Sequence, residues 1–172
     1  MRKVIAIDQD QVLANLFTPW VDAINKHENE NVPYEAVKSW DICSYFECGK
    51  RVYDYLDYNM FRNLPVIEGS QRVVSKLMDM YDVFVVTTAT SHPQSLLAKM
   101  EWLKEHFEFI PPSNIVLCGS KSIIKADVMI DDGVHNLEVF DGIKLLFDAC
   151  HNKDCDKFYR VNNWNDVEQL LL

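Results

Sequence analysis

The stretch "VIAIDQDQVLANL" at residues 4–16 is the feature that most restricts how this chain can fold. Four apolar residues run directly into Asp8 and Asp10, and a second apolar stretch follows at once. A short, unbroken apolar run is typical of a fully buried strand in a parallel sheet. A buried carboxylate is costly unless it is paired or bound to a metal ion. The stretch therefore predicts a site at the end of a buried strand, whose other parts lie elsewhere in the chain.

Further strands and helices alternate along the sequence. Apolar runs predict strands from Asp82 to Thr87 and at 114–118, 127–130 and 144–148. Helical patterns begin at Thr18, cover 68–81, start again with Ser91 as N-cap and Pro93 in the first turn, and close the chain over 162–172. Strands that alternate with helices form a mostly parallel sheet covered on both faces. We expect a Rossmann-like three-layer α/β/α core.

The region after the first strand has a different character. Residues 33–63 are dense in aromatic side chains and poor in β-branched runs, and we interpret them as about two short helices. At 172 residues the chain fits one domain that carries a small insertion. We predict a core made of 1–15 and 69–172 and a helical insertion at 16–68. Aromatic side chains of this kind are more often packing than ligand contacts.

Composition excludes several classes of protein. A net charge of −9 disfavours binding to a nucleic-acid polymer, which needs a basic face, although a local Mg²⁺ can still attract a small phosphate ester. No apolar run is long enough to span a membrane, and "MRKVIAID" meets charge too early for a signal peptide. We predict a cytoplasmic protein without a membrane partner. The sequence gives no signal about oligomeric state.

The cysteines agree with a reducing compartment. Their number is odd and their spacing is unpaired, which favours free thiols over a disulfide framework: Cys43, Cys48, Cys118, Cys150 and Cys155. The segment "CHNKDC" at 150–155 could join Cys43 and Cys48 in a zinc site, but no CxxC pair supports this, and we disfavour it.

Polar residues gather where the predicted strands end, which in open α/β sheets is where ligands bind. They are Asp8, Asp10, Thr87, Thr88, Asp131 and Asp132, with Lys121 in a neighbouring loop. Each one alone has a structural explanation as a cap, a strand former or a solvated charge. Together they form a set for phosphoryl transfer: carboxylates for Mg²⁺, a hydroxyl and an ammonium for phosphate, and a carboxyl group that moves a proton.

The segments "DQDQVLA", "VFVVTT" and "K…ADVMIDD" resemble, in order, the motifs of the haloacid dehalogenase-like phosphohydrolases. "FRNLPVIEGS", "KMEWLKEHF", "DDGVHNLEVF" and "LLFDACHN" extend the resemblance to the 5′(3′)-deoxyribonucleotidase family. The resemblance implies that Asp8 is a nucleophile that becomes an aspartyl phosphate and that Asp10 is the general acid and base. It further implies phosphate binding by Thr87, Thr88 and Lys121. Mg²⁺ would be held by Asp8, the carbonyl of Asp10 and Asp132, with Asp131 in support.

The same resemblance gives the insertion at 16–68 the role of a helical cap over the site. Trp40 and Tyr55 are candidates for contacts with nucleobase and deoxyribose, with plain packing as an equal alternative. Leu16 stands where an aromatic is expected, and Gln11 where relatives often have glycine. The implied activity is Mg²⁺-dependent dephosphorylation of deoxyribonucleoside monophosphates. The alternatives are a phosphatase of the same superfamily that acts on another small phosphomonoester, and a catalytically idle binding protein on the same fold.

Overall fold

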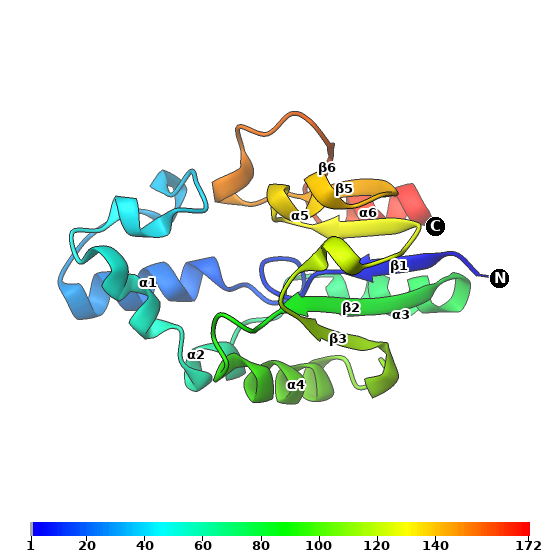
Figure 1. Cartoon of the computed structure of the whole chain (residues 1–172), viewed down its shortest axis with the longest axis horizontal. Helices are drawn as coiled ribbons and strands as arrows, with labels where there is room; N and C mark the ends of the chain where they lie inside the picture. The colour runs from blue at the N-terminus through cyan, green and yellow to red at the C-terminus, as the bar shows by residue number, and fades with distance from the viewer. Residues whose placement is uncertain (1) are drawn as a thin grey trace.

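A computed structural model describes residues 2–172 and contains one six-stranded sheet in which every strand pair is parallel (Figure 1). The strands are β1 Val4–Ile7, β2 Asp82–Thr88, β3 Ile115–Cys118, β4 Val128–Asp131, β5 Ile143–Phe147 and β6 Tyr159–Val161. The five predicted strands are confirmed to within a residue or so at their ends. Strand β6 was not predicted, because it has three residues and lies at the sheet edge with Tyr159 63% exposed, so it shows no apolar run.

The strand order β3-β2-β1-β4-β5-β6 places β1 at the centre of the sheet. The chain first builds outward from β1 through β2 to β3, and then returns to build outward on the other side from β4. The reversal between β1 and β4 is the switch point at which α/β sheets open a crevice at the carboxyl ends of their strands. Asp8 and Asp131 stand at these two ends.

Helices cover both faces of the sheet, as the three-layer prediction required. Alternation along β1 sends Ile5 and Ile7 to one face, where they pack with α3 (Ser70–Met80) and α6 (Trp164–Leu171), and Ala6 to the other, where it packs with α5 (Val134–Val139). Asn163 caps α6, as expected for the terminal helix, because its side chain accepts from the N–H groups of Asn165 and Asp166.

The prediction that Ser91 caps the next helix is wrong. Helix α4 runs over Ser95–His106 with Gln94 at its N-cap. The chain first makes a tight turn in which the Ser95 N–H donates to the His92 carbonyl at 2.8 Å. This turn delays the helix and leaves Ser91 and His92 on the loop that precedes it.

Residues 17–62 lie beyond the carboxyl ends of the strands (Figure 1). They form α1 (Phe17–Glu28), three short 3₁₀ helices and α2 (Tyr58–Arg62), so the segment is helical as expected but in more and shorter pieces. The 3₁₀ helices are η1 Tyr34–Ala36, η2 Ile42–Tyr45 and η3 Gly49–Tyr55. The division of the chain at 16 and 68 stays a prediction.

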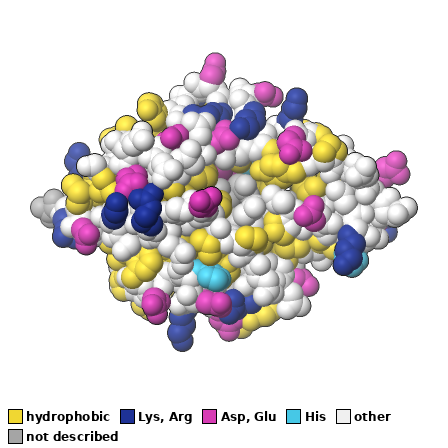
Figure 2. Space-filling view, turned by 180° about the vertical axis from the view of Figure 1, so that it is seen from behind, with side chains coloured by type: hydrophobic (Ala, Val, Ile, Leu, Met, Phe, Trp, Pro, Cys, Tyr) yellow, Lys and Arg dark blue, Asp and Glu magenta, His cyan; other side chains and the backbone are white. Residues whose placement is uncertain are grey.

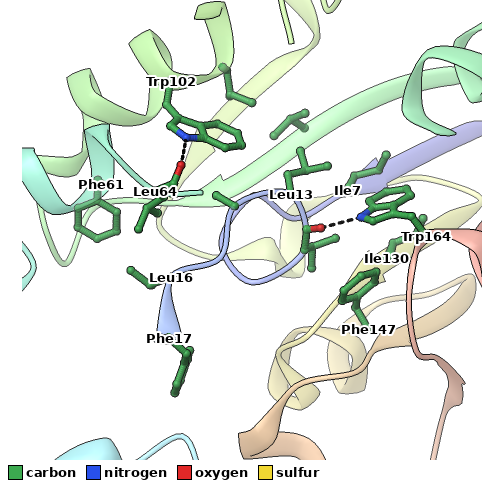
Figure 3. Close-up of a cluster of buried hydrophobic side chains, with 14 of the residues drawn as sticks. Ile7, Leu13, Leu16, Phe17, Phe61, Leu64, Trp102, Ile130, Phe147 and Trp164 are labelled. Atoms are coloured by element: carbon green, nitrogen blue, oxygen red, sulfur yellow. Dashed lines mark hydrogen bonds between the residues drawn. The ribbon is translucent and has the colours of Figure 1, made fainter. Parts of the chain in front are cut away.

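Two tryptophans fix the chain where it enters and leaves this segment (Figure 3). The indole of Trp164 donates to the Val12 carbonyl, and that of Trp102 donates to the Leu64 carbonyl, both at 2.8 Å. The two connections also pair with each other, since the N–H of Ile67 donates to the carbonyl of Leu13 at 2.8 Å. The crossing into the segment is therefore held by α4, α6 and its own backbone.

The surface carries charges of both signs. Figure 2 shows acidic and basic side chains scattered over the face opposite that of Figure 1, without a continuous basic patch there. Within residues 2–172, none of the helices has the length and apolar character needed to cross a membrane. All five cysteines are free thiols.

Candidate active site

Asp8 is the centre of a buried ionic cluster. It follows β1, its N–H donates to the carbonyl of Ile130 in neighbouring β4 at 2.9 Å, and its side chain therefore lies beside those that end β4. Lys121, which is 2% exposed, places its Nζ 2.7 Å from Asp8 Oδ1 and 2.6 Å from Asp131 Oδ2. The Gln9 N–H also donates to Asp8 Oδ1 at 2.8 Å. Both donors thus hold the same oxygen of Asp8.

Asp8, Asp131 and Asp132 offer carboxylate oxygens that lie within 4.8 Å of one another. Asp131 is already engaged, because it accepts from Lys121 and from Gly133 N–H at 2.8 Å and Asn136 Nδ2 at 3.0 Å. Asp132 is 1% exposed, and its Oδ1 has no hydrogen-bond donor among the described residues. A buried carboxylate oxygen without a donor is what a hard cation such as Mg²⁺ requires, so these residues fit the expected metal.

The pKa values agree with a cluster that lacks positive charge. Burial raises the pKa of Asp8 to about 7, although Lys121 acts in the opposite direction. Burial also raises the pKa of Asp131. For Lys121, burial lowers the pKa, but the neighbouring carboxylates of Asp131 and Asp8 outweigh it and the pKa rises. With Asp10, Lys99 and His151 included, four carboxylates face two ammonium groups and one imidazole, so negative charge is in excess and a divalent cation would offset it.

Lys99 of α4 is a member of the site that sequence analysis missed. It is 2% exposed, and its Nζ lies 2.7 Å from Asp10 Oδ2 and donates to Thr87 Oγ1 at 2.9 Å and to the Thr88 carbonyl at 2.8 Å. Its position four residues after Ser95 and three before Trp102 puts it on the buried face of the helix. A lysine within an apolar helical stripe was the signal that could have found it.

The predicted phosphate-binding residues differ in whether they line the cavity or are buried. Thr88 lines the cavity described below, whereas Thr87 is buried and its hydroxyl oxygen accepts from Lys99. This contact leaves the hydroxyl hydrogen of Thr87 free to donate. Lys121 is packed between Asp8 and Asp131 and is not among the cavity-lining residues.

A cavity of about 700 Å³ opens over the carboxylates. Asp8, Asp10 and Thr88 line it from the sheet edge, and residues of the 17–62 segment line it opposite, among them Phe17, Trp40, Tyr53 and Phe61. Leu16 also faces it.

Of the two aromatic residues predicted for the substrate pocket, Trp40 lines this cavity and is 54% exposed. Tyr55 lies elsewhere, since its hydroxyl donates to Glu28 at 2.6 Å and its ring stacks on His27. Tyr53, two residues earlier, faces the cavity in its place.

His151 is the second residue that sequence analysis did not assign to the site. It lies in the short turn η6 (Cys150–Asn152), and its Nε2 is 2.9 Å from Asp132 Oδ2. Burial acts to lower the pKa of His151, but the contact with Asp132 outweighs this effect and raises the pKa to about 9. Beside it, Asn152 donates to the Asp132 carbonyl at 2.9 Å. The structure gives no support to the disfavoured zinc site, because the metal-ligand cluster found in residues 2–172 consists of aspartates.

Gln11 occupies a backbone position that suits glycine. Its φ of 59° lies in the left-handed region, which glycine adopts more readily than any other residue. The glutamine side chain contacts the start of α1, where its Oε1 accepts from the N–H of Phe17 at 3.0 Å.

Comparison with known proteins agrees with this geometry. Residues 2–172 match the model of a family described as 5′ nucleotidase, deoxy (pyrimidine), cytosolic type C protein. The chain is 58% identical over 172 residues to a 5′(3′)-deoxyribonucleotidase of Bacillus subtilis (strain 168) and equally to one of Bacillus phage SPbeta, with both chains covered completely.

Solved structures show the same fold at low sequence identity. The protein YfnB of Bacillus subtilis, whose structure was determined bound to magnesium, superposes with a TM-score of 0.64 at 11% identity over 99% of this chain and 98% of its own. A haloacid dehalogenase-like family protein of Streptococcus pneumoniae gives a TM-score of 0.62 at 12% identity over 99% of each chain. The chain belongs to the 5′(3′)-deoxyribonucleotidase family of phosphomonoester hydrolases.

Proposed function

We propose that this enzyme removes phosphate from deoxyribonucleoside monophosphates, with Mg²⁺, through an aspartyl phosphate on Asp8. The observation that carries the proposal is the buried cluster of Asp8, Asp131 and Asp132 at an open cavity, in which Asp132 Oδ1 lacks a donor. The names of the relatives support the substrate class.

We assign the two oxygens of Asp8 different tasks on the basis of their contacts. Lys121 and the Gln9 N–H hold Oδ1, so Oδ2 is the oxygen that attacks phosphorus. A bond forms between Oδ2 and phosphorus while the ester P–O bond breaks. Asp10, held through its Oδ2 by Lys99, gives a proton to the departing alcohol oxygen.

The second half of the reaction reverses the role of Asp10. Asp10 takes a proton from water, the water oxygen bonds to phosphorus, and the bond to Asp8 Oδ2 breaks to release phosphate. We assign contacts with the phosphate oxygens to Thr88, which lines the cavity, and to the hydroxyl hydrogen of Thr87 and the ammonium of Lys121, which lie buried beside Lys99 and Asp8. Asp8, Asp132 and the Asp10 carbonyl would hold Mg²⁺, with Asp131 in support. When bound, the ion supplies positive charge that lets a phosphate dianion approach a carboxylate.

The cavity walls support a nucleotide as the small-molecule substrate. We assign residues 16–68 as a cap, whose Phe17, Trp40 and Tyr53 offer ring faces for a nucleobase. Stacking on an aromatic ring contributes about 1–3 kcal/mol per base. The net charge of −9 opposes binding to a nucleic-acid polymer. We place the enzyme in the cytoplasm.

Phosphate release from a panel of nucleoside monophosphates and unrelated phosphate esters, with Mg²⁺ and with chelator, tests the proposal. We expect metal-dependent release that favours deoxynucleotides. The variant Asp8→Asn should fold and lose at least about a thousandfold in kcat, as nucleophile removal does in enzymes with covalent intermediates. Asp141→Asn, which makes the same change at an exposed position before β5, is the matched control.

The outcomes separate the alternatives. Release from other esters alone would keep the chemistry and reject the nucleotide assignment. Near-normal turnover of Asp8→Asn would reject the covalent mechanism. Folded wild-type protein that releases no phosphate across the panel would favour a binding protein.

A further inference from the structure

The turn η6 has no part in the reaction described above, yet it encloses Asp132 from two sides. His151 reaches the carboxylate, with Nε2 2.9 Å from Oδ2, and the Asn152 side chain reaches the backbone carbonyl at 2.9 Å. Asn152 also donates to the Phe147 carbonyl at 2.8 Å and accepts from Arg160 at 2.7 Å. The turn is therefore fixed to β5 and β6 and is a rigid support for one aspartate.

The His151 ring is held equally firmly on its other side. It stacks on Phe17 of α1 with the ring centroids 4.6 Å apart, and meets Trp40 edge-on at 4.7 Å. Both aromatic rings line the cavity. One imidazole thus contacts the cavity wall on one side and the Asp132 carboxylate on the other.

We infer that His151 is a positioning residue that orients Asp132 toward the metal and couples this ligand to the Phe17 and Trp40 wall of the cavity. The inference rests on the proposed function, because it takes Asp132 as the metal ligand. An imidazole that occupies Oδ2 leaves Oδ1 for the cation and prevents the carboxylate from rotating away. Groups that orient metal ligands in this way change metal affinity by about 10–100-fold when they are removed.

Mg²⁺ affinity in the absence of substrate tests the role directly. The affinity is obtained from the rise of Tm with Mg²⁺ concentration, a readout that does not depend on turnover. His151→Phe keeps a ring against Phe17 and Trp40 and removes both nitrogens, so we expect Mg²⁺ affinity to fall about 10–100-fold. His151→Gln places an amide nitrogen near the position of Nε2 and should restore most of the affinity.

Controls distinguish the role of the nitrogen from packing. His106→Phe makes the same exchange in an imidazole that packs on Trp102 at 4.9 Å, outside the site, and should leave Mg²⁺ affinity unchanged. If His151→Phe does not fold, the same measurement is made on His151→Met, which also lacks a nitrogen donor.

Two results would overturn the inference, and they are distinguishable. If the wild type responds to Mg²⁺ and the Phe or Met variant has the same affinity within about twofold, well below the expected change, His151 does not position Asp132 while the proposed function stands. If the wild-type Tm does not respond to Mg²⁺ at all, both the proposed metal-dependent function and the inference about His151 are wrong.

Discussion

At the scale of single residues, Lys99 is the group on which the arrangement of Asp10 depends. Its ammonium is almost completely buried and contacts Asp10, Thr87 and the Thr88 carbonyl. Lys99→Met removes the charge and leaves three acceptors without their donor. Breaking a buried ion pair costs about 3–5 kcal/mol, so we expect the free energy of unfolding to fall by about 3 kcal/mol in urea denaturation.

A double-mutant cycle shows whether this loss comes from the charge. In an Asp10→Asn background, Lys99→Met should cost at least about 1 kcal/mol less than in the wild type. Lys104→Met, on the exposed face of the same helix, should be nearly neutral. Equal costs in both backgrounds would assign the loss to the unpaired Thr87 and Thr88 acceptors and to packing against Phe61, whose ring centroid lies 5.2 Å from the ammonium, instead of to the ion pair.

At the scale of elements, the junction between the sheet and residues 17–62 depends on α6. Trp164 donates to the carbonyl of Val12, a residue with no exposed surface. Trp164→Phe leaves this carbonyl without a partner and without water, and we expect the free energy of unfolding to fall by about 2 kcal/mol or more, since the smaller ring also leaves a void.

Tyr81→Phe is the comparison for that prediction. Its hydroxyl donates to the Leu171 carbonyl at 2.9 Å near the surface, where water can replace it. We expect a loss below about 1 kcal/mol by urea denaturation. Equal losses in the two variants would mean that burial of the Val12 carbonyl does not matter.

Elements also show what a sequence can predict and what it cannot. Asp8, Asp131 and Asp132 were predictable because parallel strands bring their carboxyl ends together, so a linear pattern implies a spatial cluster. Lys99 and His151 reach the cluster from a helix and a turn, and their partners depend on how these pack against the sheet. Tyr53 and Tyr55 show the same limit, because the 3₁₀ geometry of η3 decides which one faces the cavity.

At the scale of the whole molecule, the sheet and the residues beyond it share one hydrophobic cluster. Ile7 and Ile130 of the sheet, Trp102 of α4 and Ile24 of α1 all belong to it (Figure 3 shows the part around Ile7 and Trp102). A continuous cluster favours one cooperative unfolding transition over separate melting of two parts.

Ile24→Ala tests this continuity, because Ile24 has no exposed surface and lies in α1, away from the sheet. Removing its side chain should lower the free energy of unfolding by about 2–5 kcal/mol. If the molecule unfolds as one unit, the opening free energy measured by amide hydrogen exchange should fall by the same amount in β1 and β4 as in α1. Leu97→Ala, at a position 61% exposed, should change neither. Faster exchange confined to residues 17–62, with β1 and β4 unaffected, would show that the aromatic segment opens independently, and the cavity wall would then move without the carboxylates.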